Sequence, residues 1–219
     1  MKKVSILGCG WIGRALEALL CTEYEMHCLS RDIVANDMKG HYRCDTLVIA
    51  IPPRDNYLEV LRETLCRLGG STQVILLSSI SFYDDKPLVV EAEKLVAKMH
   101  KGSVLLRLGG LMGYDRIAGK YTAGRVLHAD SGTNYVHRDD VLGIIERIII
   151  LNITDDVFDV VAPLQSTKKE IFSQNAQKFG FKSTEFLENK TRGKVLTPSK
   201  LCSRLNYQFL KEDVQEFWN

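Results

Sequence analysis

The sequence predicts an α/β protein with a doubly wound, mostly parallel β-sheet. Nearly continuous apolar strands alternate with amphipathic helices between residues 4 and 161, and a glycine-rich turn joins the first strand to the first helix. Such strands are typical of parallel sheets that helices cover on both faces. With 45% hydrophobic and 26% charged residues, the chain of 219 residues is also able to build a full core.

The first 29 residues form the pattern of one βαβ unit. Residues 4–7 are a short apolar run closed by Gly8, and apolar residues then recur at helical spacing from residue 11 to residue 20. Residues 24–29 follow as a second strand. Because both strands are expected in one parallel sheet, the crossover between them should be right-handed.

The same alternation continues to residue 161. Further strands are expected at residues 46–51, 73–77, 104–108 and 157–161, and further helices at residues 58–68, 88–99, 141–151 and 172–179. Residues 109–133 show no clean period and are interpreted as functional loops with a short helix. We expect a dinucleotide-type domain over residues 1–162 and a small C-terminal lobe over residues 163–219.

Composition excludes several classes of protein. The 29 Lys and Arg residues nearly balance the 27 Asp and Glu residues, which argues against a protein that coats nucleic acid. Charged residues interrupt every apolar stretch, so no membrane span or signal peptide is expected, and a cytoplasmic location follows. The five histidines lack the spacing of a metal site. No cysteine pair forms a CxxC motif, and we expect all six cysteines to be reduced.

Residues 8–13 read GCGWIG and match the pattern G-x-G-x-x-G. The pattern follows a strand and opens a helix, which is the context of a dinucleotide-binding turn in a Rossmann-type fold. The first glycine permits the tight turn, the second lets the backbone approach a pyrophosphate, and the third lets helix and strand pack closely. Gly8, Gly10 and Gly13, with Trp11 and Ile12 between them, are therefore candidate cofactor-binding residues. A plain glycine turn is the alternative.

The end of the second strand bears on the choice of cofactor. An NAD site usually has an acidic residue there to hold the ribose, whereas this chain has Ser30 followed by Arg31. A guanidinium binds a 2′-phosphate through paired hydrogen bonds, so NADP is favoured over NAD. Asp32 leaves NAD open, because a shift of one residue would place its carboxylate on the ribose. Pro52, at the end of the 46–51 strand, is a further cofactor candidate or a simple helix start.

Four segments in fixed order resemble the short-chain dehydrogenase/reductase family in its extended form, also called the NAD-dependent epimerase/dehydratase family. They are residues 8–13 (GCGWIG), 78–83 (SSISFY), 106–113 (LRLGGLMG) and 134–140 (NYVHRDD). The resemblance covers about residues 3–162. It implies a trimmed Rossmann-type fold, a nicotinamide cofactor and a small-molecule substrate. The short chain is most similar to the atypical, YeeZ-like members of the family.

The resemblance also suggests catalytic residues and one departure. Ser79 takes the place of the family's catalytic serine, and Lys94 that of the lysine that holds the ribose. The position four residues before Lys94, where the family has its catalytic tyrosine, is Val90, which cannot transfer a proton. Tyr83 is the nearest phenol that could act as the acid. For Ser79 the structural alternative is a loop cap, and for Lys94 it is an exposed surface charge.

Two functions follow from these observations. The first is an NADP(H)-dependent oxidoreductase or epimerase-like enzyme; the second is a non-catalytic NADP-binding redox sensor or regulatory protein that retained the pocket and lost the acid. Arg and Tyr side chains in and after the 104–108 strand suit an anionic substrate; they are Arg107, Tyr114, Arg116, Tyr121 and Arg125. By the resemblance, the helices over residues 56–68 and 88–99 would also pair in a homodimer.

Overall fold

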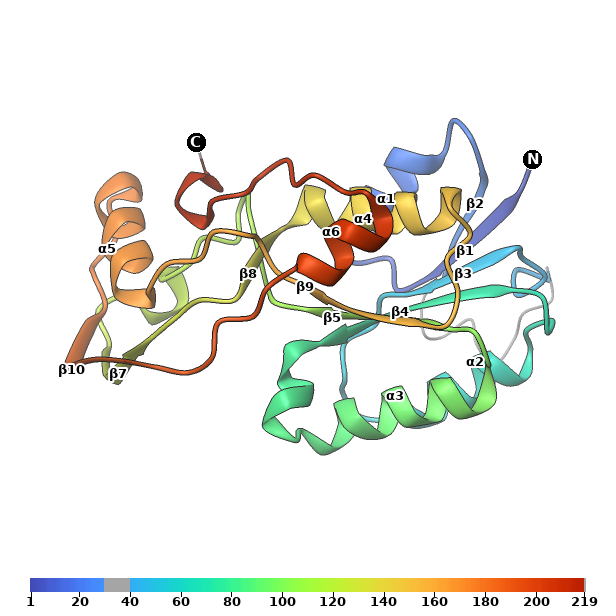
Figure 1. The fold of residues 1–219 in the computed structure, drawn as a ribbon, viewed down its shortest axis with the longest axis horizontal. Coiled ribbons are helices and arrows are strands. Elements are labelled where there is room, and N and C mark those ends of the chain that lie inside the picture. The colour runs from blue at the N-terminus through green and yellow to red at the C-terminus, as the bar shows by residue number, and fades with distance from the viewer. Residues whose placement is uncertain (30–39, 219) are drawn as a thin grey trace. The chain divides into compact units, whose positions relative to one another are not determined.

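The computed structural model describes residues 1–29 and 40–218, and it contains a six-stranded sheet in the order β2-β1-β3-β4-β5-β9 (Figure 1). β1 pairs in parallel with both β2 and β3, and β3 pairs in parallel with β4. The predicted α/β fold is thus confirmed. The strands are β1 (Lys3–Leu7), β2 (Glu25–Leu29), β3 (Thr46–Ile49), β4 (Gln73–Ser79), β5 (Val104–Leu108) and β9 (Asp156–Val160).

Helices cover this sheet on both faces. α2 and α3 lie along one face, and α1 and α4 lie along the other (Figure 1). From β1 the strand order continues to β2 at one edge of the sheet, and from β3 onward it proceeds toward the opposite edge. Ligands of doubly wound sheets bind at such a switch point. The helices are α1 (Gly13–Leu20), α2 (Tyr57–Cys66), α3 (Pro87–Met99) and α4 (Arg138–Ile150).

The contacts divide the chain into two compact units. Unit 1 comprises Met1–Arg107 and Leu142–Phe158, and unit 2 comprises Leu108–Val141 and Asp159–Asn219. The expected boundary near residue 162 stays a prediction. Within the described residues, no helix has both the length and the apolar character that a membrane span requires.

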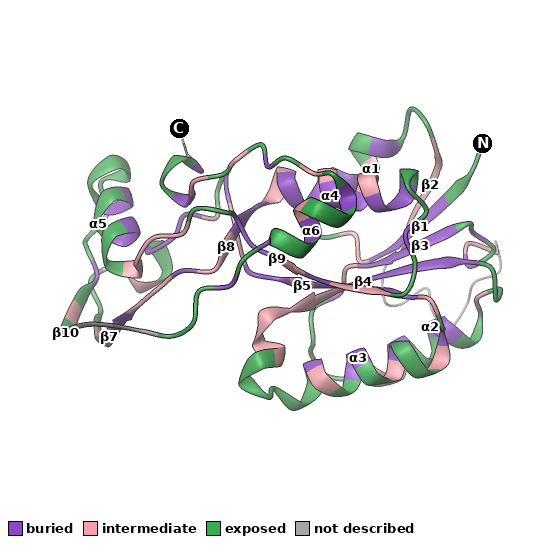
Figure 2. Ribbon diagram, viewed as in Figure 1, coloured by how far each residue is buried: buried purple, intermediate pink, exposed green. Residues whose placement is uncertain are grey.

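The core of unit 1 fills the space between the sheet and the α2–α3 layer. Leu47, Ile49, Leu61, Leu76 and Val96 are all buried there. β1, β3 and β4 are buried along most of their length, whereas the outer sides of α2 and α3 are exposed (Figure 2).

The buried side chain of Gln73 in β4 links the C-terminal part of α4 to the sheet. The amide nitrogen of Gln73 donates to the carbonyl oxygens of Ile148 (3.2 Å) and Ile153 (2.9 Å), and Thr46 donates to its amide oxygen (3.0 Å). Every polar atom of this buried amide is therefore satisfied, which buried polar groups require.

Unit 2 contains more strands than the sequence pattern indicates. Two small parallel sheets pair β6 with β8 and β7 with β10, and β6 and β7 lie inside the 109–133 segment that was expected to be loops. These strands are short or unevenly buried, so they lack a clear apolar alternation. The elements are β6 (Gly110–Met112), η3 (Lys120–Thr122), β7 (Val126–Ser131), β8 (Tyr135–His137), α5 (Lys168–Phe179), β10 (Glu185–Arg192), α6 (Ser199–Leu205) and η4 (Val214–Glu216).

Helix α5 organises the core of unit 2. Thr167 and Glu170 form a capping box at its N-terminus, and Gly180 closes it in the left-handed conformation. Ile171 and Phe172 of this helix belong to a buried cluster with Ala118, Ala162, Val214 and Phe217.

Candidate functional site

The glycine-rich turn between β1 and α1 is built from contacts that only glycine allows. Gly8 has a φ of +117°, and a Cβ there would lie 2.8 Å from the carbonyl carbon and oxygen of Ala50. A Cβ on Gly13 would collide with the carbonyl oxygen of Gly8. Gly10 is different: it is exposed, and a Cβ would meet no described atom within 4 Å. Gly8 and Gly13 therefore serve the fold, whereas Gly10 faces space that no described residue fills.

Helix α1 points an uncapped N-terminus at this turn. Ile12 occupies the N-cap position without a side-chain hydrogen bond, and the first turn contains no acidic residue. The N–H groups at the start of the helix and the positive end of its dipole favour an anion. The Nε of Arg14 donates to the carbonyl oxygen of Cys9 (3.0 Å), which adds a positive charge beside the turn.

The other predicted cofactor residues lie at or near the same edge of the sheet. Trp11 is half-buried, Ile12 is buried, and Pro52 is exposed after the end of β3. Ser30 and Arg31 lie outside the described residues, so the preference for NADP stays a prediction.

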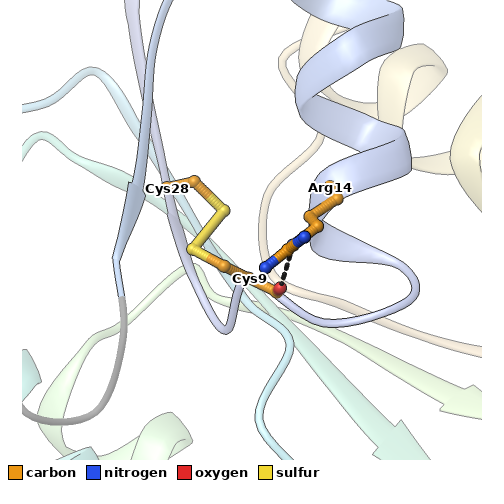
Figure 3. Close-up of a disulfide and its surroundings, with 3 residues drawn as sticks. All are labelled: Cys9, Arg14 and Cys28. Carbon is orange, nitrogen blue, oxygen red and sulfur yellow. Dashed lines mark hydrogen bonds between the residues drawn. A yellow bond between two sulfur atoms is a disulfide. The ribbon is translucent and has the colours of Figure 1, made fainter.

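Two cysteines of unit 1 form a disulfide. Cys9, between the first two glycines, is bonded to Cys28 in β2, and their Cα atoms are 5.6 Å apart (Figure 3). The expectation of six reduced cysteines is therefore wrong for this pair, because the absence of a CxxC spacing says nothing about cysteines on neighbouring strands and turns. Four cysteines are free: Cys21, Cys44, Cys66 and Cys202.

A buried ion pair between β5 and α3 contacts polar side chains at and just after the end of β4. The Arg107 guanidinium in β5 binds the Glu93 carboxylate of α3, with Nη2 2.8 Å from Oε2 and Nε 3.1 Å from Oε1. Ser78 donates to the same carboxylate (2.6 Å). The side chains of Glu93 and Arg107 are only 4% and 15% exposed. Arg107, expected to attract an anionic substrate, has its charge balanced by Glu93.

This ion pair also fixes the candidate acid Tyr83. The Nη1 of Arg107 donates to the phenol oxygen of Tyr83 (3.1 Å), and the guanidinium stacks on the Phe82 ring, 3.5 Å from its centroid. Burial lowers the pKa of Arg107, but the hydrogen bonds to Glu93 and Tyr83 outweigh this effect and raise it overall. The guanidinium is therefore a permanent cation next to the Tyr83 phenol.

Ser79 acts as a cap in the structure. Its hydroxyl oxygen accepts the backbone N–H of Ser81 (3.2 Å) and the hydroxyl of Ser81 (3.0 Å), at the start of the 3₁₀ helix η2 (Ile80–Asp84). Both bonds use Ser79 as an acceptor, which leaves its own O–H able to donate to a substrate oxygen.

The α3 positions suggested by the resemblance differ in exposure. Lys94 is exposed, Val90 is half-buried, and Glu93, which the sequence reasoning missed, is buried. A signal for Glu93 was present: it lies in line with Val89, Ala92 and Val96 on the buried face of the helix. A carboxylate in an apolar stripe needs a buried cation, and Arg107 supplies it.

Unit 2 has a pocket of its own, lined by both polar and aromatic side chains. Tyr114 donates to Asp139 (2.7 Å), and Arg138 stacks over the Tyr114 ring at 4.0 Å. Burial lowers the pKa of His137, which accepts the backbone N–H of Asp139 through Nδ1. The pocket measures about 350 Å³ and is lined by Tyr114, His137, Asp139, Phe179, Lys211, Phe217 and Trp218. Of the other loop residues, Tyr121 and Arg125 are exposed and Arg116 is half-buried.

Asp140, at the start of α4, binds a distant loop of the same unit. Its carboxylate accepts the backbone N–H groups of Leu210 (2.6 Å) and Lys211 (3.1 Å), and the hydroxyl of Tyr207 (3.2 Å). Burial raises the pKa of Asp140 to about 6, although these hydrogen bonds act in the opposite direction. This residue therefore joins segments of unit 2 that are far apart in the chain.

The parallel sheet and the glycine turn define a Rossmann-like α/β protein. The chain is 25% identical to the protein YeeZ of Escherichia coli strain K12, with 97% of each chain covered. No family model matches the chain.

Solved structures share the fold over nearly the whole chain. A putative NAD-dependent epimerase/dehydratase from Methylobacillus flagellatus has a TM-score of 0.79 at 22% identity, with 99% of this chain and 96% of that chain covered. The human epimerase family protein SDR39U1, solved with NADPH, has a TM-score of 0.73 at 16% identity, with 98% and 97% covered. A UDP-glucuronic acid 4-epimerase from Bacillus cereus, solved with UDP-glucuronic acid and NAD, has a TM-score of 0.76 at 15% identity, with 98% and 96% covered.

Over nearly its whole length the chain is thus similar to YeeZ in sequence and shares its fold with solved proteins of the epimerase/dehydratase type.

Proposed function

We propose that this protein binds a nicotinamide dinucleotide, with NADP(H) preferred over NAD(H), and acts as an oxidoreductase or epimerase-like enzyme on a small anionic substrate. The observation that carries the proposal is the open glycine turn: in the described part of the chain, nothing fills the space next to Gly10 at the uncapped N-terminus of α1. Structural neighbours solved with NADPH or NAD support the same ligand class.

The residues present fit this ligand. The N–H groups at the start of α1 and the guanidinium of Arg14 suit a pyrophosphate, and the absence of a Cβ at Gly10 lets the backbone come close to it. Ser30, Arg31 and Lys94 would hold the ribose and its phosphate. The nicotinamide, when bound, supplies the hydride chemistry, and the protein orients it.

The chain's own contribution to the chemistry would come from Ser79 and Tyr83. Ser79 has a hydroxyl proton to donate to a substrate oxygen, and its position is fixed by two hydrogen bonds from Ser81. Tyr83 is held by Arg107, whose cation would stabilise negative charge that develops on the phenol oxygen during proton transfer. Val90 contributes no proton at the position of the family's tyrosine.

A second candidate is a non-catalytic dinucleotide-binding regulator. Val90 favours it, because the usual proton relay on that helix is absent, and so does the disulfide that joins the glycine turn to β2. Both candidates require dinucleotide binding; only the first requires turnover.

The Gly10→Val substitution tests binding. A side chain at position 10 meets no described atom of the protein, so the fold should persist while the approach of the pyrophosphate is blocked. Calorimetry in thiol reductant should show NADPH binding by the natural protein and its loss in Gly10→Val at an unchanged melting temperature. Gly70→Val is the matched control, because Gly70 is also exposed with empty space around it. Absence of NADPH and NADH binding by the natural protein would disprove the proposal.

Turnover then separates the two candidates. A screen of carbonyl compounds and sugar nucleotides, followed by NADPH absorbance, should give slow reduction that Tyr83→Phe and Ser79→Ala remove without weakening NADPH binding. Binding without any turnover would favour the regulator. Fast turnover that survives both substitutions would show that the active site lies elsewhere.

A further inference from the structure

The Cys9–Cys28 disulfide joins the two segments between which a dinucleotide would bind. Cys9 is part of the glycine turn, and Cys28 is the last residue but one of β2. The backbone N–H of Gly8 also donates to the carbonyl oxygen of Leu29 (2.8 Å), so the turn and the strand end are adjacent. In a dinucleotide-binding fold the pyrophosphate lies on this turn and the ribose lies at the end of this strand.

We propose that Cys9 and Cys28 form a redox-active modification site that controls dinucleotide binding: the dithiol form binds and the disulfide form does not. This inference rests on the proposed binding function. A covalent bridge between turn and strand occupies the span that the ribose and pyrophosphate have to cross. It also ties Cys9, the residue next to Gly10, to β2.

The surroundings of the pair suit reversible chemistry. Cys9 and Cys28 are both partly exposed, so small thiols and disulfides reach them. Arg14 donates to the backbone of Cys9 (Figure 3). This bond holds the backbone of Cys9, whose sulfur takes part in thiol–disulfide exchange once it is reduced to the thiolate.

The exchange balances with a low-molecular-weight disulfide such as glutathione disulfide as the oxidant. One cysteine thiolate attacks the glutathione disulfide, which forms a mixed disulfide and releases one glutathione. The second cysteine then displaces the other glutathione and closes the Cys9–Cys28 bond. The two cysteines lose two electrons and two protons in total, and these appear in two molecules of glutathione. Excess glutathione reverses both steps.

The experiment compares the two redox states of the full chain. The protein is equilibrated with reduced or oxidised glutathione, alkylated and digested, and mass spectrometry identifies the Cys9–Cys28 cross-link. NADPH affinity is then measured by calorimetry in each state. We expect the oxidised protein to bind NADPH more weakly by about tenfold or more, and reduction to restore binding.

Two cysteine variants make the test specific. The double variant Cys9→Ser/Cys28→Ser removes both thiols with little change in size, so it forms neither the bond nor a mixed disulfide with glutathione, and it should bind NADPH like the reduced protein under both conditions. Cys21→Ser is the matched control: Cys21 is free and exposed in the same unit, so this variant should keep the full redox response.

The remaining outcomes overturn the inference. Equal NADPH affinity in both states would show that the bond does not control binding, while the proposed function survives. If reduced glutathione does not break the cross-link, the disulfide is permanent and structural. If oxidised glutathione does not form the cross-link, the two cysteines do not form a disulfide under these conditions. Either result overturns the inference. If neither the reduced protein nor the Cys9→Ser/Cys28→Ser variant binds a dinucleotide, the proposed function fails, and the inference fails with it.

Discussion

Arg31 follows Ser30 at the position where a dinucleotide-binding strand selects its cofactor. If its guanidinium binds the 2′-phosphate, Arg31→Ala should weaken NADPH binding by roughly 1.5–3 kcal/mol, as expected for a lost charge-assisted hydrogen bond. NADH affinity should stay unchanged. Calorimetry with both cofactors measures this, and Arg62→Ala on the exposed side of α2 serves as the control. An equal loss for both cofactors would contradict the role of Arg31.

Glu93 is the residue on which the ion pair behind Tyr83 depends. Glu93→Gln leaves the buried Arg107 guanidinium without a carboxylate, and removal of one partner from a buried pair typically costs about 3–5 kcal/mol. Because glutamine keeps some hydrogen bonds, we expect a loss of about 2–4 kcal/mol in the free energy of unfolding. Denaturant titration measures it. Glu91→Gln, on the exposed side of the same helix, should cost little, and equal effects of the two substitutions would refute the prediction.

At the scale of elements, α3 and α4 each carry a buried carboxylate on an otherwise apolar face. Glu93 of α3 pairs with a cation, whereas Asp140 of α4 accepts two backbone N–H groups and a tyrosine hydroxyl. Burial raises the pKa of the Asp140 carboxylate to about 6.

This raised pKa predicts the pH dependence of stability. A carboxyl whose pKa is higher in the folded state stabilises the fold at low pH, and the stabilisation is lost as pH rises through the folded value. Relative to Asp140→Asn, the free energy of unfolding of the natural protein should fall by about 2 kcal/mol between about pH 4.5 and about pH 7.5. His137, with its lowered pKa, acts in the opposite direction in both proteins and cancels in the difference. Parallel curves would rule out this titration.

At the scale of the whole molecule, pairing of two chains through α2 and α3 stays a prediction. Two of the apolar residues that suggested it, Val89 and Val96, are buried within the chain, whereas Leu88 is 42% exposed. If Leu88 lies in a dimer interface, light scattering at micromolar concentration should show twice the mass of the 24.7 kDa chain, and Leu88→Lys should halve it.

The control for this prediction lies on another helix. Leu19 of α1 is also 42% exposed, and Leu19→Lys should leave the mass unchanged. A single species of 24.7 kDa for the natural protein would exclude the dimer.

The sequence by itself determined the parallel sheet, its covering helices and the glycine turn of this protein. Each of these depends on local patterns: buried strands are continuous apolar runs, helices repeat their apolar residues at a fixed spacing, and the turn needs glycine at Gly8 and Gly13. The strands β6, β7, β8 and β10 of unit 2 were not predicted, because their residues show no such pattern.

Only the tertiary structure decided which polar and sulfur groups meet. Cys9 and Cys28 are 19 residues apart, and Asp140 is 70 residues from Leu210. Glu93 lies only 14 residues from Arg107, yet the two are on different elements. Such pairs form when separate strands, helices and loops pack against one another. A buried charge or a thiol then interacts with the partner that the packing places next to it.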